Sequence, residues 1–223
     1  MKPARLLSPS RIAGFTLIEL LIVVAIIGVL AGMVIANWSN MKLYGQRAAS
    51  LSNIRQIGAA FYSYAGDNDQ RLPRRATGTN NGDKWPKLLS EYLQDVRVYA
   101  AVGDRSNYIF QGQDPVDNTH NRTSYIMNGY NDLGAFTNAS VEVRLSALPN
   151  PANVILLGTP KSGSTHFYMD ILEGKNGNQV DVLNLVMYGS GSDYLFADGS
   201  ARFLSTNEYD ATMWLVDKSF QIP

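Results

Sequence analysis

The chain contains no cysteine and has no surplus of charge, and both absences limit what it can do. Disulfides, thiolate metal sites and a cysteine nucleophile are excluded in all 223 residues. Nineteen basic and nineteen acidic residues give a formal net charge of zero. That balance argues against a nucleic-acid-binding domain held by broad electrostatics, so no nucleic-acid partner is predicted.

Histidine is also scarce, and the usual catalytic patterns are missing. The chain has two histidines, and their spacing supports no zinc site. No phosphate-binding glycine loop is present, and no nucleophile, base and orienting group stand out together. The sequence therefore predicts that the protein is not an enzyme. Its apolar content of 45% and charged content of 17% predict a packed core.

Charge is missing from one long stretch near the N-terminus. Residues 14–32 read GFTLIELLIVVAIIGVLAG, and Glu19 is the one acid among them. The apolar run is long enough to cross a hydrocarbon core as a helix, which takes about 20 residues. An ionisable group in that core costs roughly 2.5–3.5 kcal/mol on insertion scales, so we expect Glu19 to have a use. The residues before the run include three basic ones and no acid: Lys2, Arg5 and Arg11. This charge distribution predicts that the N-terminus stays in the cytoplasm and that the rest of the chain is exported.

Three kinds of N-terminal segment share this pattern. An ordinary signal peptide would be cut after Ala36, but Glu19 would then lie in its apolar region without purpose. A permanent anchor meets the same difficulty. The third kind is a prepilin signal, in which a short basic leader ends at Gly14 and the apolar helix is kept.

The run from Gly14 onward closely resembles the N-terminal segment of type IV pilins and type II secretion pseudopilins. The resemblance implies that a prepilin peptidase cuts between Gly14 and Phe15 and that the new N-terminus, Phe15, is methylated. It also implies that Glu19 pairs with the N-terminal amine of a neighbouring subunit during assembly. A buried carboxylate is tolerable when a cation meets it, and the next subunit would bring that cation.

One departure from the family concerns the lower part of this helix. Many pilins carry a proline where Ala36 stands, so the usual kink is not expected. Gly28, Gly32 and Ala36 instead form a ladder of small residues, which lets helices approach closely in a membrane. Glycines at these positions would equally make local unwinding easy, and small residues are common in membrane helices in any case. These alternatives stay open.

The apolar periodicity predicts one helix over residues 15–64. Ile54, Ile57 and Phe61 recur at helical spacing, and Gly66 is a plausible stop. Beyond it we expect a short helix over 85–93, a terminal helix over 207–216 and several strands, with Asp198-Gly199 as a hairpin turn. The strands are predicted at 124–127, 154–157, 166–171, 180–187, 194–197 and 201–204.

This pattern predicts an α+β fold of the type IV pilin-like, lollipop kind, with a long N-terminal helix packed on a small antiparallel β-sheet. The predicted organisation is a leader (1–14), a transmembrane and assembly half of the helix (15–36), an amphipathic half (37–66) and a globular α+β domain (67–223).

The C-terminal half resembles pseudopilin-G-like proteins with a His-x9-Asp-Gly motif. The segments SYIMNGY (124–130), NVILLG (153–158) and DYLFADGSARFL (193–204) carry the likeness. Tyr188 stands at the histidine position, which puts any role of that histidine in doubt. Some pseudopilins of the G type bind calcium in a C-terminal loop, so Asp193 and Asp198 are candidate calcium ligands. The alternative is that Asp198 is only a turn residue.

The predicted function is that of a structural filament subunit, most specifically a type II secretion pseudopilin. Before assembly it would be a single-pass protein of the bacterial inner membrane, where its partners would be lipid, the prepilin peptidase and an assembly platform. It would then assemble with copies of itself into a periplasmic or cell-surface filament. The alternatives are a type IV pilus subunit for adhesion, motility or DNA uptake, and a secreted binding protein released after Ala36.

Overall fold

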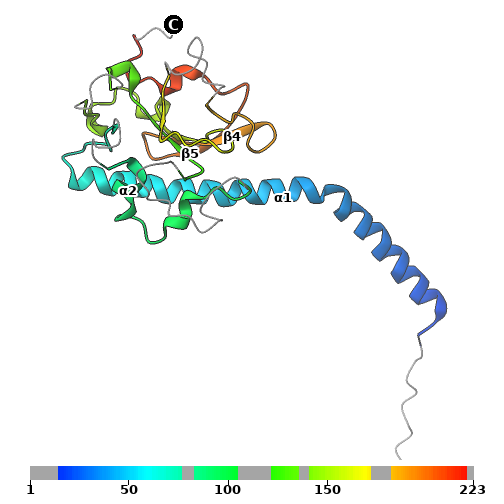
Figure 1. Cartoon of the computed structure of the whole chain (residues 1–223). Helices are drawn as coiled ribbons and strands as arrows, with labels where there is room; N and C mark the ends of the chain where they lie inside the picture. Colours follow the sequence, from blue (N-terminus) through cyan, green and yellow to red (C-terminus); the bar gives the residue numbers. More distant parts are fainter. Residues whose placement is uncertain (1–14, 77–82, 105–121, 136–140, 172–181, 220–223) are drawn as a thin grey trace, which may run out of the picture. The chain divides into compact units, whose positions relative to one another are not determined.

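A computed structural model describes residues 15–76, 83–104, 122–135, 141–171 and 182–219 (Figure 1). The predicted leader and the residue before the expected cleavage, Gly14, lie outside this range. The structure divides into two compact units, residues 1–42 and 43–223, and helix α1 (Leu17–Asp67) runs through both. The predicted long helix is thus confirmed, with its end at Asp67 close to the expected stop.

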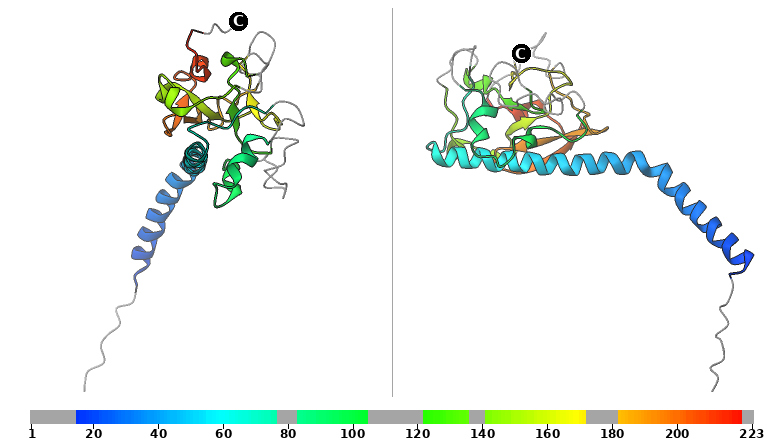
Figure 2. Two further views of the ribbon diagram at one scale, coloured as in Figure 1. Left: turned by 90° about the vertical axis from the view of Figure 1, so that its left-hand side faces the viewer. Right: turned by 60° about the horizontal axis from the view of Figure 1, so that its bottom comes forward.

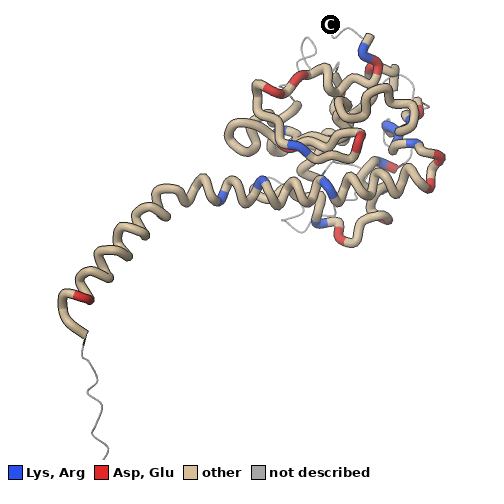
Figure 3. Tube along the Cα trace, turned by 180° about the vertical axis from the view of Figure 1, so that it is seen from behind, with Lys and Arg blue, Asp and Glu red and all other residues tan. Residues whose placement is uncertain are grey.

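The first unit is the N-terminal part of α1, where the described side chains are exposed. Residues 20–41 carry no charged side chain, and Figure 3 shows this uncharged stretch of the tube. Among the described residues, α1 is the one helix long and apolar enough to span a membrane. An ordinary secretion signal would meet the same criterion, so length and composition alone do not separate the alternatives.

The second unit is built on a five-stranded sheet with the order β3-β1-β2-β4-β5. The strands are β1 (Ile126–Asn128), β2 (Ile155–Gly158), β3 (Tyr168–Met169), β4 (Gly191–Phe196) and β5 (Ala201–Ser205). Three neighbouring pairs are antiparallel, but β1 and β3 are parallel. The α+β fold is therefore as predicted, and the sheet is mixed rather than wholly antiparallel.

The later part of α1 lies along one face of this sheet (Figures 1 and 2). Its buried side chains include Ile54, Ile57 and Phe61, which join a core cluster with Leu157 and Leu195. Gly58 allows the close approach, because a Cβ there would lie 2.8 Å from a terminal methyl of Leu195. Burying three large apolar side chains of this size contributes on the order of 5–9 kcal/mol before entropy is counted.

The opposite face of the sheet carries a second core cluster. Alternate residues of β4 point to opposite faces, so Tyr194 and Phe196 pack with Trp214 while Leu195 faces α1. Asn128 ties this face to the C-terminal segment, because its Nδ2 donates to the carbonyl oxygens of Ile155 and Trp214, both at 2.8 Å. The sheet is thus covered on both sides.

The remaining elements are short. Helix α2 (Trp85–Ser90) ends before the predicted residue 93, and the predicted terminal helix is one 3-10 turn, Ala211–Trp214. The predicted strand at 180–187 is wrong over its described part, where turns surround a single bridge between Leu183 and Pro160. Within the described ranges, the other 3-10 turns are Val96–Tyr99, Asn131–Leu133, Leu145–Ala147 and Pro151–Asn153.

Candidate functional site

Glu19 lies in the first turn of α1, where it forms a reciprocal cap with Thr16. The Thr16 backbone N–H and hydroxyl both donate to Glu19 Oε2, at 2.8 and 2.7 Å. In return the Glu19 N–H donates to Thr16 Oγ1 at 3.3 Å. This arrangement is a capping box, which satisfies backbone donors that the first helical turn otherwise leaves unpaired.

This cap was not predicted from the sequence, although the Thr-x-x-Glu spacing of residues 16–19 is its signature. The cap holds a carboxylate at the end of α1 where the helix dipole favours negative charge. Phe15, the residue expected to become the N-terminus, directly precedes Thr16 and is 79% exposed. The carboxylate and the expected new amine are therefore four residues apart along the chain, at the same helix end.

The predicted packing ladder lies further along α1. The helix passes through Gly28, Gly32 and Ala36 without interruption. A Cβ placed on Gly28 or on Gly32 would meet no atom within 4 Å. Within one subunit these glycines therefore leave an open strip on the helix surface. Whether other helices pack there stays a prediction.

The two candidate calcium ligands lie in different surroundings. Asp193 is in the middle of β4 with a side chain only 1% exposed, whereas Asp198 lies in the exposed turn after β4. The Asp198 carboxylate accepts hydrogen bonds from the Ser200 N–H at 2.9 Å and from its hydroxyl at 2.6 Å. Within the described ranges, no group of three or more histidine, aspartate or glutamate side chains could hold a metal ion. Calcium binding therefore stays a prediction, and Asp198 has a turn-forming role of its own.

Asp193 faces α1, and its environment is unusual for a carboxylate. Neither of its carboxylate oxygens has a hydrogen-bond donor among the described residues. The nearest cation is Arg47, whose Nε lies 3.9 Å from Oδ1 while its guanidinium stacks 3.7 Å from the centre of the Phe203 ring. Burial raises the pKa of Asp193 to about 7, against the opposing effects of Arg47 and Arg55 on α1.

Tyr188, at the position where the predicted resemblance has a histidine, lies in the same neighbourhood as Asp193. Its ring is buried, and burial raises its pKa to about 12 while a hydrogen bond with Ser50 opposes that rise. Ser50 also accepts the Val102 N–H at 2.9 Å, so it links α1 to the loop that follows the 3-10 turn Val96–Tyr99. The substituted position thus helps to close the interface between α1 and the sheet.

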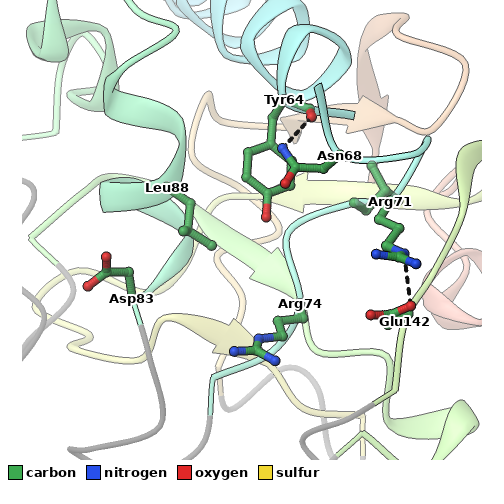
Figure 4. A pocket seen from close by; sticks show the side chains of 8 residues that line it. Tyr64, Asn68, Arg71, Arg74, Asp83, Leu88 and Glu142 are labelled. Atoms are coloured by element: carbon green, nitrogen blue, oxygen red, sulfur yellow. Dashed lines mark hydrogen bonds and ion pairs between the residues drawn. The ribbon is translucent and has the colours of Figure 1, made fainter. Parts of the chain in front are cut away.

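A polar hollow opens at the C-terminal end of α1, and none of the residues that the sequence predicted to be functional lines it (Figure 4). Arg71 Nε forms an ion pair with Glu142 at 2.9 Å, and the Asn68 side chain donates to the Tyr64 carbonyl at 2.8 Å. The walls of the hollow carry both positive and negative side chains, and its lining residues do not form a nucleophile–base pair. The lining residues are Tyr64, Asn68, Arg71, Leu72, Arg74, Asp83, Leu88 and Glu142.

Comparison with known proteins finds a known motif in the N-terminal segment. Residues 9–35 match the family described as "Prokaryotic N-terminal methylation motif". The chain is also 35% identical over 94 residues to the type IV major pilin protein PilA of Myxococcus xanthus (strain DK1622). The chain therefore carries a prepilin-type N-terminal segment and is similar to a type IV pilin. The likeness is to structural subunits and not to enzymes.

The match to the pilin covers 42% of this pilin-like chain and 40% of the Myxococcus protein. The family motif covers the expected cleavage site, Glu19 and both glycines of the ladder. No solved structure gives a significant match to the chain. These findings do not separate a secretion pseudopilin from a pilus subunit.

Proposed function

We propose that this pilin-like protein is a structural subunit of a type IV pilus-like filament, most specifically a type II secretion pseudopilin. A prepilin peptidase would remove residues 1–14, and an inner-membrane platform would then move the subunit from the lipid into the filament. The observation that carries the proposal is the capped carboxylate of Glu19 at the start of a helix whose large apolar side chains between Leu20 and Ile35 are exposed.

The apolar side chains of the helix restrict the environments in which it is stable. Exposed apolar side chains along residues 20–36 are stable in lipid or against other such helices, but not in water. Leaving the membrane requires another apolar surface, which copies of the same helix supply. Glu19 would then accept a hydrogen bond from the methylated, positively charged amine of Phe15 of a neighbouring subunit. The carboxylate that leaves the membrane surface would thus be paired with an opposite charge in the filament.

Glu19→Gln is the decisive variant, because it keeps the side-chain length and a carbonyl that can cap Thr16 while removing the charge. We expect mass spectrometry to find N-methylated Phe15, and electron microscopy to find no filaments. Thr16→Val is the matched control, since it removes the hydroxyl half of the cap and keeps the carboxylate. Normal filaments from Glu19→Gln would overturn the mechanism.

A pilus subunit for adhesion, motility or DNA uptake is the second candidate, and the identity to a major pilin favours it. Neighbouring genes separate the two: a secretin and secretion ATPase support the pseudopilin, and a retraction motor supports the pilus. The third alternative is secretion after Ala36. A mature N-terminus at Asn37 instead of Phe15 would establish it.

A further inference from the structure

The apolar part of α1 has defined polar boundaries. Residues 20–36 contain no polar side chain, Glu19 precedes them, and Asn37 follows. Seventeen residues of helix are about 26 Å long, slightly less than the roughly 30 Å of a bilayer's hydrocarbon core. A segment this short has no length to spare for tilting, so its two ends have to lie close to the two membrane surfaces.

Trp38 lies immediately past the outer boundary and differs from the other tryptophans. Its side chain is 64% exposed, whereas Trp85 and Trp214 are 0% and 2% exposed in the two cores. An exposed indole combines a large apolar ring with an N–H donor, which suits the headgroup region better than either water or hydrocarbon. Asn37 beside it turns its amide back to the Met33 carbonyl at 3.0 Å, which reduces the polarity exposed one turn deeper.

Lys42 follows one turn after Trp38 and is the first cation of the helix. Its long apolar stem and exposed ammonium fit the level of the lipid phosphates, just outside an interfacial tryptophan. The order along the helix is therefore apolar side chain, indole, cation. This order matches the order of hydrocarbon, glycerol region and phosphate in a bilayer leaflet.

We propose that Trp38 and Lys42 bind the phospholipid headgroup region of the outer leaflet and so fix the depth of the helix, placing Glu19 at the inner boundary. Glu19 and Trp38 are 19 residues apart, about 28 Å along the helix. This register rests on the proposed function as a membrane-stored subunit. It changes the meaning of Glu19, which lies at the lipid surface facing the leader and not in the middle of the hydrocarbon.

The outer end can be tested by fluorescence of the full chain in phosphatidylethanolamine–phosphatidylglycerol vesicles. Lipids brominated near the headgroup end of the acyl chain should quench more than lipids brominated near the bilayer centre. Trp38→Phe should lose this quenching, because the other two tryptophans are buried. In that background Ile35→Trp, one turn deeper, should shift the strongest quenching toward the centre. Strongest quenching of Trp38 by central bromines, or none by either lipid, would overturn the proposal.

The inner end can be tested with single cysteines, since no native cysteine competes. A water-soluble maleimide supplied to both faces should label Glu19→Cys readily and Val23→Cys, one turn further in, much less. Equal protection of both would overturn the placement of Glu19. These results are separate from those for filament formation. A chain that inserts at this depth but forms no filament would contradict only the proposed function.

Discussion

The carboxyl of Asp193 should make the folded protein less stable as the pH rises, and Asp193→Asn should remove that effect. Burial raises its pKa from 3.8 to about 7. A shift of this size makes the ionised form about 4 kcal/mol less stable in the fold than in the unfolded chain. Because the folded pKa is the higher one, the native state retains the proton over this interval. The stabilisation is complete below pH 3.8 and is lost as the pH rises through 7.

Between pH 5 and pH 8 the wild-type protein should lose about 2–3 kcal/mol of unfolding free energy through this group alone. Asp193→Asn keeps the shape and cannot ionise, so its stability should exceed that of the wild type increasingly over the same interval. Denaturation in uncharged detergent micelles, followed by the signals of the buried Trp85 and Trp214, measures the difference. Other titrating groups are present in both proteins and cancel in that difference.

Arg47→Met is the matched partner variant, because it keeps an apolar stem over Phe203 and removes the nearest cation. It should destabilise the wild type more at pH 8 than at pH 5, and should show no such pH dependence when Asp193 is already asparagine. A constant difference between Asp193→Asn and wild type across the pH range would refute the reasoning. So would a variant less stable than wild type at pH 8, since Asp193 would then be ionised and held by Arg47.

Three further changes test the packing of the globular unit by thermal denaturation. Arg75→Met removes the guanidinium that pairs with the 3% exposed carboxylate of Asp170 and should cost about 3–5 kcal/mol, whereas adding Asp170→Asn should restore part of this; a cost below 1 kcal/mol would show that the pair is not effectively buried. Gly191→Ala should destabilise by several kcal/mol, because its Cβ would overlap the backbone carbonyl of Leu204; a melting temperature within a degree of wild type would contradict this close contact. Asp132→Ala removes the acceptor of two backbone N–H groups of the C-terminal segment and should cost about 1–3 kcal/mol, and an unchanged melting temperature would mean that water replaces it.

Periodicity and turn chemistry predicted the parts of the fold that depend on local sequence. The helical spacing of Ile54, Ile57 and Phe61 identified the side of α1 that is buried. The Asp198-Gly199 pair identified the turn between β4 and β5, where Gly199 has a φ of +82° that favours glycine. Both signals are local, because a repeat or a turn is written within a few residues.

Features that depend on contacts between residues far apart in the sequence could not be predicted from local patterns. The segment around Leu183 has the composition of a strand, but its side chain fills the second core cluster and its backbone makes one bridge. The parallel pairing of β3 with β1 depends on how the chain connects these two strands, which the alternation of apolar and polar residues does not encode. The burial of Asp193 also depends on distant residues, because the sequence does not say that α1 covers its face of β4.

The residues of the candidate site likewise differ in whether local sequence could predict their roles. The prepilin pattern around Glu19 is contiguous, so residue type and order predicted it, and the family motif at residues 9–35 agrees. The cap with Thr16 was equally local and could have been predicted from its spacing. Packing of Gly28 and Gly32 concerns other copies of the chain, and neither the sequence nor a single subunit determines it.

The burial that begins at Ser50 has a practical consequence for isolating the globular unit in water. Residues from Ser50 to Ala65 of α1 supply core side chains, so a fragment that starts within this stretch would lack part of its own interior. A fragment that starts at Leu43 keeps the whole second unit and omits the apolar half of the helix. The border between what needs lipid and what folds in water therefore falls inside one unbroken helix, where no loop marks it.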